Sequence, residues 1–219
     1  MERPTIKSFK LRGTRITAAQ IDARERLWSQ FGVTYNSELL DLQSLFSGFE
    51  KVVMEIGFGM GEATVEIARN FPATAFLAND VHQPGIGKLL SLIEENSLSN
   101  VRVMDEDAHL ILTTMIDNES LDGINLFFPD PWPKTRHHKR RIINAEFIAL
   151  AASRMKQGGV FNIATDWVPY AQWIADAFSQ SEQFSGGIIP RPEWRPLTRF
   201  EGQGITKDHQ VTDLRYLKN

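Results

Sequence analysis

Short apolar runs alternate with amphipathic stretches along the chain from residue 51 onward. The first run, Lys51 to Ile56, is rich in β-branched residues and predicts a buried strand. Apolar residues with i, i+3, i+4, i+7 spacing, typical of one helix face, then occur at 64–71, 86–93, 108–115, 148–155 and 170–177. Strand-like runs lie between them at 74–78, 101–104, 123–128 and 160–164. This alternation predicts an α/β fold with a mostly parallel sheet and helices on both faces.

The two ends of the chain lack this rhythm. We expect residues 1–50 to form an N-terminal extension, a basic arm followed by helices, of which Thr17 to Phe31 is the first. A loop and helix at Ser37 to Phe49 would lead into a second domain, residues 51–219. From Ile188 onward, prolines and glycines predict a long loop that ends in a terminal strand, Gln210 to Leu217.

The composition of the 219 residues, 42% hydrophobic and 23% charged, is globular. Cysteine is absent, which excludes disulfides, thiolate nucleophiles and cysteine-based zinc sites. We expect no membrane span, no metal site and a cytoplasmic location, because no apolar run nears roughly 18 residues and no signal peptide is visible. Ten of the 24 Lys and Arg residues lie in two acid-free segments, 3–15 and 134–141, which leaves 14 against 27 acids elsewhere. Such segregation favours a polyanionic partner.

Acidic residues follow five consecutive predicted strands. A single acid at such a place is commonly a helix N-cap, but ligands of parallel sheets bind beyond the carboxyl ends of the strands. Acids at all five strand ends together therefore predict a site at that edge. They occur in Glu55-x-Gly57, Asn79-Asp80, Asp105-Glu106-Asp107, Pro129-Asp130 and Thr165-Asp166.

The glycine-rich run that follows the first strand, Gly57-x-Gly59-x-Gly61-Glu62, allows three interpretations. A dinucleotide fingerprint would need glycine where Glu62 stands, and a carboxylate there would repel a pyrophosphate. A plain tight turn is the second. We favour the third, S-adenosylmethionine, whose amino and sulfonium groups are cationic. Asp80 would then accept from both ribose hydroxyls and Asp107 from the adenine amine.

The run Phe127-Phe128-Pro129-Asp130-Pro131-Trp132-Pro133-Lys134 predicts a stiff loop, because three alternating prolines exclude a helix. It could be a plain rigid connection in which Asp130 satisfies local amides. An acid beside an aromatic ring also suits a nucleobase, and two histidines and five cations follow at once. A basic loop alone is commonly just solvated, but next to Asp130 and Trp132 it favours nucleic acid.

Several motifs together resemble the bacterial tRNA (guanine-N7)-methyltransferases. They include the glycine run from Glu55, the run Asp80-Val81-His82-Gln83-Pro84-Gly85, the proline-flanked Asp130 with its basic run, Ala164-Thr165-Asp166-Trp167, Arg195-Pro196-Leu197-Thr198-Arg199-Phe200-Glu201, and the start Ile6-Lys7-Ser8-Phe9. The resemblance implies a Rossmann-like class I methyltransferase fold with a C-terminal antiparallel strand. At two positions the chain departs from the family: Asp80 stands where Glu is usual, and Thr212 where Trp is.

The resemblance also implies roles for individual residues. Asp130 would be catalytic. The residues that would bind S-adenosylmethionine are Glu55, Gly57, Gly59, Asp80, Asp107 and Asp130. The substrate nucleotide would be contacted by Lys134, Asp166, Thr198, Arg199, Phe200 and Glu201. The tRNA would be contacted by Arg136, His137, His138, Lys139, Arg140 and Arg141. A guanine in the variable loop would be the target, and the protein would act as a monomer or homodimer.

Guanine N7 carries a lone pair and no proton, so its methylation needs orientation rather than a general base. Asp130, with Asp166 or Glu201, would accept from guanine N1–H and the 2-amino group. The alternatives are an exocyclic-amine methyltransferase, a non-catalytic RNA-binding protein of the same fold, and a nicotinamide oxidoreductase. Cofactor titration and analysis of the modified nucleoside separate them.

Overall fold

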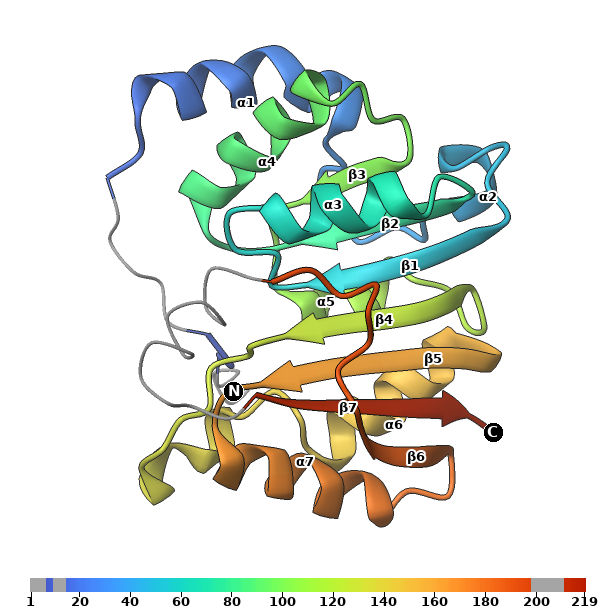
Figure 1. The fold of residues 1–219 in the computed structure, drawn as a ribbon. Helices are drawn as coiled ribbons and strands as arrows, with labels where there is room; N and C mark the ends of the chain where they lie inside the picture. The colour runs from blue at the N-terminus through green and yellow to red at the C-terminus, as the bar shows by residue number, and fades with distance from the viewer. Residues whose placement is uncertain (1–6, 10–14, 198–210) are drawn as a thin grey trace, which may run out of the picture.

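The computed structural model describes residues 7–9, 15–197 and 211–219 of the chain (Figure 1). The strands in this part are β1 (Lys51–Ile56), β2 (Thr74–Asn79), β3 (Val101–Met104), β4 (Leu121–Phe127), β5 (Met155–Thr165), β6 (Phe184–Ile189) and β7 (Thr212–Lys218). They form one sheet in the order β3-β2-β1-β4-β5-β7-β6. The first five strands pair in parallel, and β7 is antiparallel to both of its neighbours. The predicted mixed α/β sheet with a C-terminal antiparallel strand is confirmed.

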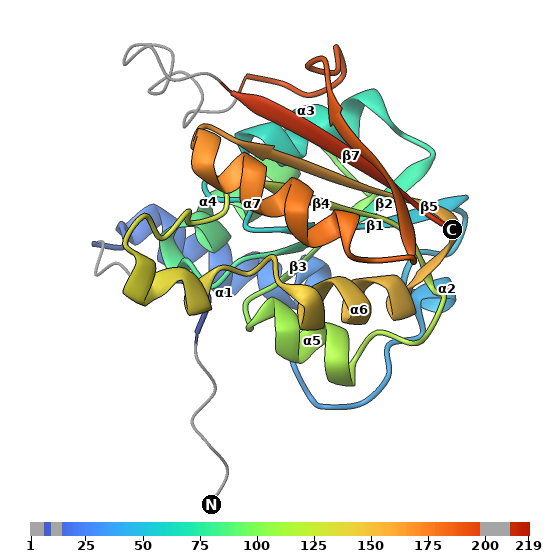
Figure 2. The ribbon, with the colours of Figure 1, turned by 90° about the horizontal axis from the view of Figure 1, so that it is seen from below.

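Helices cover both faces of the sheet (Figure 2). They are α1 (Ala18–Phe31), α2 (Leu42–Leu45), α3 (Glu62–Asn70), α4 (Gln83–Glu95), α5 (Ala108–Thr114), α6 (Ala145–Arg154) and α7 (Val168–Ser179), with a 3₁₀ helix η1 (Thr135–Arg140). One buried apolar cluster joins α1, α3 and α4 to the sheet, and a second joins α5, α6 and α7 to it. Two separate apolar layers on one sheet are what the near-continuous hydrophobic runs of the central strands require.

The strand order reverses between β1 and β4. The chain builds outward from β1 through β2 to β3, then returns to place β4 on the other side of β1. The connections that follow β1 and β4 therefore run in opposite directions along the sheet. In such sheets a crevice forms between these two loops at the carboxyl ends of the strands. In Figure 1 this edge lies at the left, where the arrowheads of the parallel strands end.

The described part of the expected N-terminal extension packs against the sheet domain. Helix α1 begins at a capping box between Thr17 and Gln20 and lies along α4. Gly87 in α4 permits this close approach, since a Cβ there would lie 2.3 Å from the Gln20 carbonyl oxygen. The backbone then joins the sheet edge where Val33 N–H donates to the Val103 carbonyl at 2.8 Å. The division at residue 50 stays a prediction.

Strand β6 was missed by the sequence analysis. It carries two adjacent glycines, Gly186 and Gly187, which are typical of turns rather than strands. The structure explains one of them, because a Cβ at Gly186 would lie 2.1 Å from the Arg215 carbonyl oxygen on β7. The predicted long loop therefore begins after Ile189, not at Ile188.

Candidate active site

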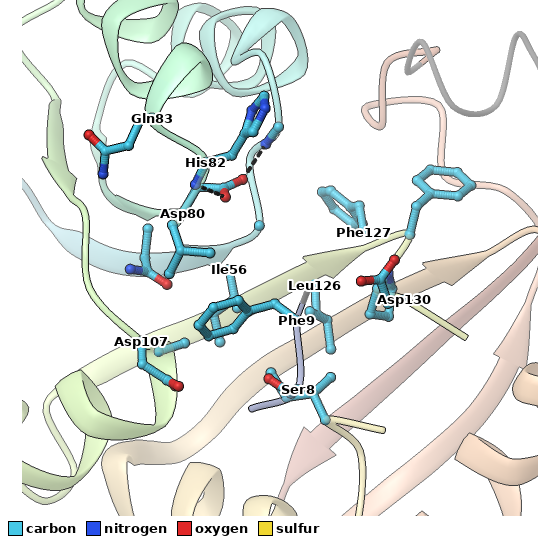
Figure 3. A pocket seen from close by; sticks show the side chains of 18 of the residues that line it. Ser8, Phe9, Ile56, Asp80, His82, Gln83, Asp107, Leu126, Phe127 and Asp130 are labelled. Atoms are coloured by element: carbon cyan, nitrogen blue, oxygen red, sulfur yellow. Dashed lines mark hydrogen bonds between the residues drawn. The ribbon is translucent and has the colours of Figure 1, made fainter. Parts of the chain in front are cut away.

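A cavity of about 420 Å³ opens at the carboxyl ends of β1, β2 and β4 (Figure 3). This volume lies in the range of roughly 300–1,000 Å³ that is usual for small-molecule sites. We call it the rim cavity. Its walls come from the β1–α3 loop, the β2–α4 loop, the start of α5, the loop after β4, and the N-terminal segment. The lining residues are Ser8, Phe9, Ile16, Ile56, Gly57, Gly59, Asn79, Asp80, Val81, His82, Gln83, Pro84, Asp107, Ala108, Leu126, Phe127, Phe128, Pro129, Asp130 and Ile142.

The glycine loop after β1 is fastened to the neighbouring loop by Asp80. One carboxylate oxygen of Asp80 accepts from Gly59 N–H at 2.7 Å, and the other accepts from His82 N–H at 2.8 Å. Burial raises the pKa of Asp80, and these two backbone donors oppose that rise. Gly59 is itself in tight contact, because a Cβ at Gly85 of α4 would lie 1.8 Å from its carbonyl oxygen. The predicted site residues Gly57, Gly59 and Asp80 therefore share one cavity wall.

Glu55, expected to bind the cofactor directly, lies next to the end of β1 and does not line the rim cavity. Its side chain is 4% exposed. Burial raises the pKa of Glu55 to about 7, and repulsion by Asp80 acts in the same direction. Close to neutral pH the carboxyl group is consequently divided between its neutral and its charged form.

The opposite wall of the rim cavity carries Asp107, which caps α5 by accepting from His109 N–H at 2.9 Å. Figure 3 shows the side chain of Phe9 between Asp107 and Leu126, with Ser8 beside it. Ser8 and Phe9 were not among the residues predicted to form this site. Their contact partners follow about a hundred residues later in the chain, and no periodicity links them to the rim.

The loop that follows β4, residues 128–134, carries Asp130 and is called the Asp130 loop below. Phe128 and Trp132 flank the Pro-Asp-Pro run, and both adopt left-handed backbone angles, φ 54° and 43°. Such angles are strained for aromatic residues and persist only where surrounding contacts hold them. Phe128 N–H donates to the Ala164 carbonyl on β5 at 2.7 Å, and Trp132 Nε1–H donates to the Ser8 carbonyl at 2.9 Å. The predicted non-helical loop is confirmed, with Asp130 at the cavity wall (Figure 3), and its stiffness stays a prediction.

The basic run after Asp130 forms the 3₁₀ helix η1, where the sequence analysis expected a loop. Lys134, Arg136 and Lys139 are exposed, whereas His137, His138 and Arg140 are partly covered. The Arg140 guanidinium lies 4.8 Å from the centre of the Trp132 ring, and the His137 and His138 rings lie 5.8 Å from Trp132 and 5.6 Å from Trp173. Partial burial and the surrounding cations lower the pKa of His137.

Arg141, expected beside these residues as a tRNA contact, is placed differently. Its side chain is 4% exposed and packs against Tyr170 and Trp173 of α7. The reason is tertiary: η1 ends at Arg140, and Tyr170 and Trp173 of α7 cover the side chain that follows.

Of the expected substrate contacts, Asp166 directly follows β5 and is half-buried, while Lys134 lies outside the lining of the rim cavity. Because β4 and β5 are neighbours in the sheet, the residues that follow them, Asp130 and Asp166, lie at the same edge. Thr198, Arg199, Phe200 and Glu201 fall outside the described residues.

Comparison with known proteins identifies the family. Residues 50–214 match a family model described as "Putative methyltransferase". A tRNA (guanine-N(7)-)-methyltransferase of Streptomyces avermitilis is 50% identical over 216 residues, which cover 96% of this chain and 74% of that protein. The enzyme of the same name from Neisseria meningitidis serogroup A is 48% identical over 213 residues, covering 96% and 90%. This chain belongs to the tRNA (guanine-N7)-methyltransferase family.

Solved structures support the fold expected of this methyltransferase family. The 16S rRNA methyltransferase KamB superposes with a TM-score of 0.62 at 15% identity, over 83% of this chain and 95% of that one. A Streptococcus mutans protein described as a "putative methyltransferase", in complex with SAH, gives 0.54 at 11% identity, over 94% and 100%. At such low identity the likeness concerns the fold, and the predicted class I methyltransferase fold is confirmed.

Among the described residues, no helix combines the length and the apolar character that crossing a bilayer demands. In the same part of the chain, no three His, Asp or Glu side chains come together as metal ligands.

Proposed function

We propose that the protein transfers a methyl group from S-adenosylmethionine to N7 of a guanine in tRNA. The relatives at 50% and 48% identity carry this activity in their names. The main structural support for this proposal is the set of residues that line the rim cavity. It brings three carboxylates, Asp80, Asp107 and Asp130, to one space at the switch point of the sheet.

The cavity suits S-adenosylmethionine better than a dinucleotide. Three carboxylates line it, and no Lys or Arg does among the described residues, so the lining would repel a pyrophosphate. Carboxylates instead accept hydrogen bonds from ribose hydroxyls and amino groups. Gly57 has a φ of 79° and lines the cavity, and a Cβ at this position would meet no heavy atom within 4 Å. The backbone there is therefore open to a ligand.

We assign the ribose hydroxyls to Asp80 and the adenine amine to Asp107. The bound donor supplies an electrophilic methyl group on a positively charged sulfur. Glu55 acts from the end of β1, just before the glycine loop, where its ionised form attracts a cationic ligand at a distance. This role is electrostatic, since Glu55 does not line the cavity.

Asp130 orients the guanine in this proposal. N7 attacks with its own lone pair, so the residue removes no proton from it. A fixed carboxylate that accepts from N1–H and the 2-amino group aligns the base, and it stabilises the positive charge that develops on the purine during transfer. Adenine lacks these donors on the corresponding edge. A strained, proline-braced loop serves this purpose because it holds the carboxylate with little freedom.

The exposed cations Lys134, Arg136 and Lys139 would contact tRNA phosphates beside the Asp130 loop. Asp166 and the segment 198–201 would complete the nucleotide site. A guanine of the variable loop as target, a cytoplasmic location and a monomeric or homodimeric state are further parts of the proposal. They rest on the resemblance to the family.

The test is to incubate the purified protein with unmodified tRNA transcript and methyl-labelled S-adenosylmethionine, then digest the tRNA to nucleosides. We expect 7-methylguanosine, and strand scission after reduction and amine treatment, which only an N7-methylated guanine permits. Label on an exocyclic amine would instead support the alternative methyltransferase. If the protein binds the donor in a titration but methylates no nucleoside, the result would support the alternative of a non-catalytic RNA-binding protein.

A further inference from the structure

Arg141 is a buried cation without a carboxylate partner in the described part of the chain. The other deeply buried arginine, Arg195, forms a two-bond ion pair with Asp213 at 2.6 and 2.9 Å. Arg141 is 4% exposed, yet no ion pair joins it to an acid in residues 7–9, 15–197 and 211–219. Burial without a counter-charge is unfavourable and needs compensating contacts.

These contacts come from two directions. The guanidinium lies 4.7 Å from the ring centre of Trp173 and 5.0 Å from that of Tyr170, so two aromatic faces of α7 receive the charge. Trp173 in turn donates from Nε1 to the Ile143 carbonyl at 2.8 Å. On its other side, Arg141 Nε donates to the Pro131 carbonyl at 2.9 Å. The Arg141 side chain thus links α7 to the peptide group between Pro131 and Trp132, one residue after Asp130.

That peptide group lies in the strained part of the Asp130 loop. The residue before Pro129 and the residue after Pro131 both have left-handed backbone angles, which an aromatic residue adopts only under constraint. The Ala164 carbonyl anchors the loop at Phe128, and the Arg141 bond anchors it at Pro131. Asp130 lies between the two anchors.

We propose that Arg141 is a positioning residue for methyl transfer, which fixes the Asp130 loop through the Pro131 carbonyl rather than contacting tRNA. The inference rests on the proposed function. A guanidinium is required, because it can stack flat on the aromatic rings while Nε donates in its own plane. A lysine ammonium is a compact charge that cannot make both contacts from one position.

The neighbouring Arg140 provides a matched control. It has the same side chain, belongs to the same basic run, lies over Trp132 and is only partly buried. Arg140→Ala should raise the KM for tRNA and lower the slope of log affinity against log salt by about 0.7–0.9. Arg141→Ala and Arg141→Lys should leave that slope unchanged and the KM for tRNA within about twofold of wild type.

The decisive measurement is kcat for the three variants, expressed per donor-binding site by calorimetric titration so that unfolded protein is not counted. We expect Arg141→Ala and Arg141→Lys both to lose at least about 10-fold in kcat, within the roughly 100-fold that a 1 Å misplacement can cost. A kcat restored by lysine would show that charge alone matters and would overturn the inference. So would a rise in KM with unchanged kcat, the pattern of a tRNA contact, or a kcat equal to that of wild type.

The two levels of the proposal fail in different ways. If the wild-type protein binds the donor but forms no 7-methylguanosine, the proposed function is wrong. If the wild type is active and the Arg141 variants behave like Arg140→Ala, the positioning role alone is wrong.

Discussion

Glu55 allows a direct measurement of how strongly the end of β1 is desolvated. The perturbation is Glu55→Gln, which replaces the carboxyl group by an amide that resembles its protonated form in shape and does not titrate. Burial raises the pKa of Glu55 from 4.5 to about 7, with a contribution from Asp80. The folded protein therefore holds this proton more tightly than the unfolded chain does.

The sign and size of the effect follow by linkage. A raised pKa contributes stability that is fully present below the unfolded value of 4.5 and is lost as pH rises through the folded value of about 7. With 1.36 kcal/mol for each tenfold change in proton affinity, the loss between pH 5 and pH 8 is about 2.5 kcal/mol. Glu55→Gln lacks this dependence, so the free energy of unfolding of the wild type relative to the variant should fall by that amount.

The assay is urea unfolding of both proteins at half-unit steps from pH 5 to pH 8. Glu66→Gln, an exposed site on the neighbouring helix α3, provides the control. Its difference from wild type should stay constant to within about 0.5 kcal/mol over the same range. A Glu55→Gln difference as flat as that of the control would refute the argument that burial governs this carboxyl group.

Three further predictions concern single carboxylates. Asp130→Asn should lower kcat by about 100-fold or more while leaving the unfolding curve unchanged, and turnover close to that of wild type would remove Asp130 from the mechanism. Asp80→Asn should weaken donor binding about 10- to 100-fold in calorimetry, since a charged hydrogen-bond acceptor contributes roughly 1.5–3 kcal/mol, and an unchanged Kd would exclude this carboxylate from the site. Asp213→Asn breaks the buried pair with Arg195 and should lower the free energy of unfolding by about 3–5 kcal/mol in urea, whereas a loss below about 1 kcal/mol would contradict it.

The strands and helices that surround the site could be predicted because their signals are local. β1 and β3 have the bounds expected from their apolar runs, 51–56 and 101–104. The acids follow the carboxyl ends of the strands. Parallel pairing places all these strand ends at one edge of the sheet, whatever the conformation of the loops. This is why Asp80, Asp107 and Asp130 meet at one cavity as expected.

The placement of Arg141 could not be predicted, because its burial depends on residues elsewhere in the chain. In the sequence, Arg140 and Arg141 are adjacent and alike, and a run of like charges indicates a solvated surface. The difference between them comes from Tyr170 and Trp173, which α7 brings back over the loop about thirty residues later. The same holds for Phe9, whose place at the cavity depends on the path of the N-terminal segment.

The strain in the Asp130 loop fits a reaction that requires no proton transfer from the nucleophilic nitrogen. A general base can act over a range of side-chain positions if a water molecule or a rotation brings it to the proton. A carboxylate that works by aligning a base and by facing a developing charge must already be in place, since its contribution depends on pre-organisation. Left-handed angles at Phe128 and Trp132 cost free energy in the folded state, and that cost is sustained by contacts from β5, the N-terminal segment and Arg141. Three separate parts of the fold converging on one short loop are what a rigid orienting group needs, and a freely titrating base would have no use for them.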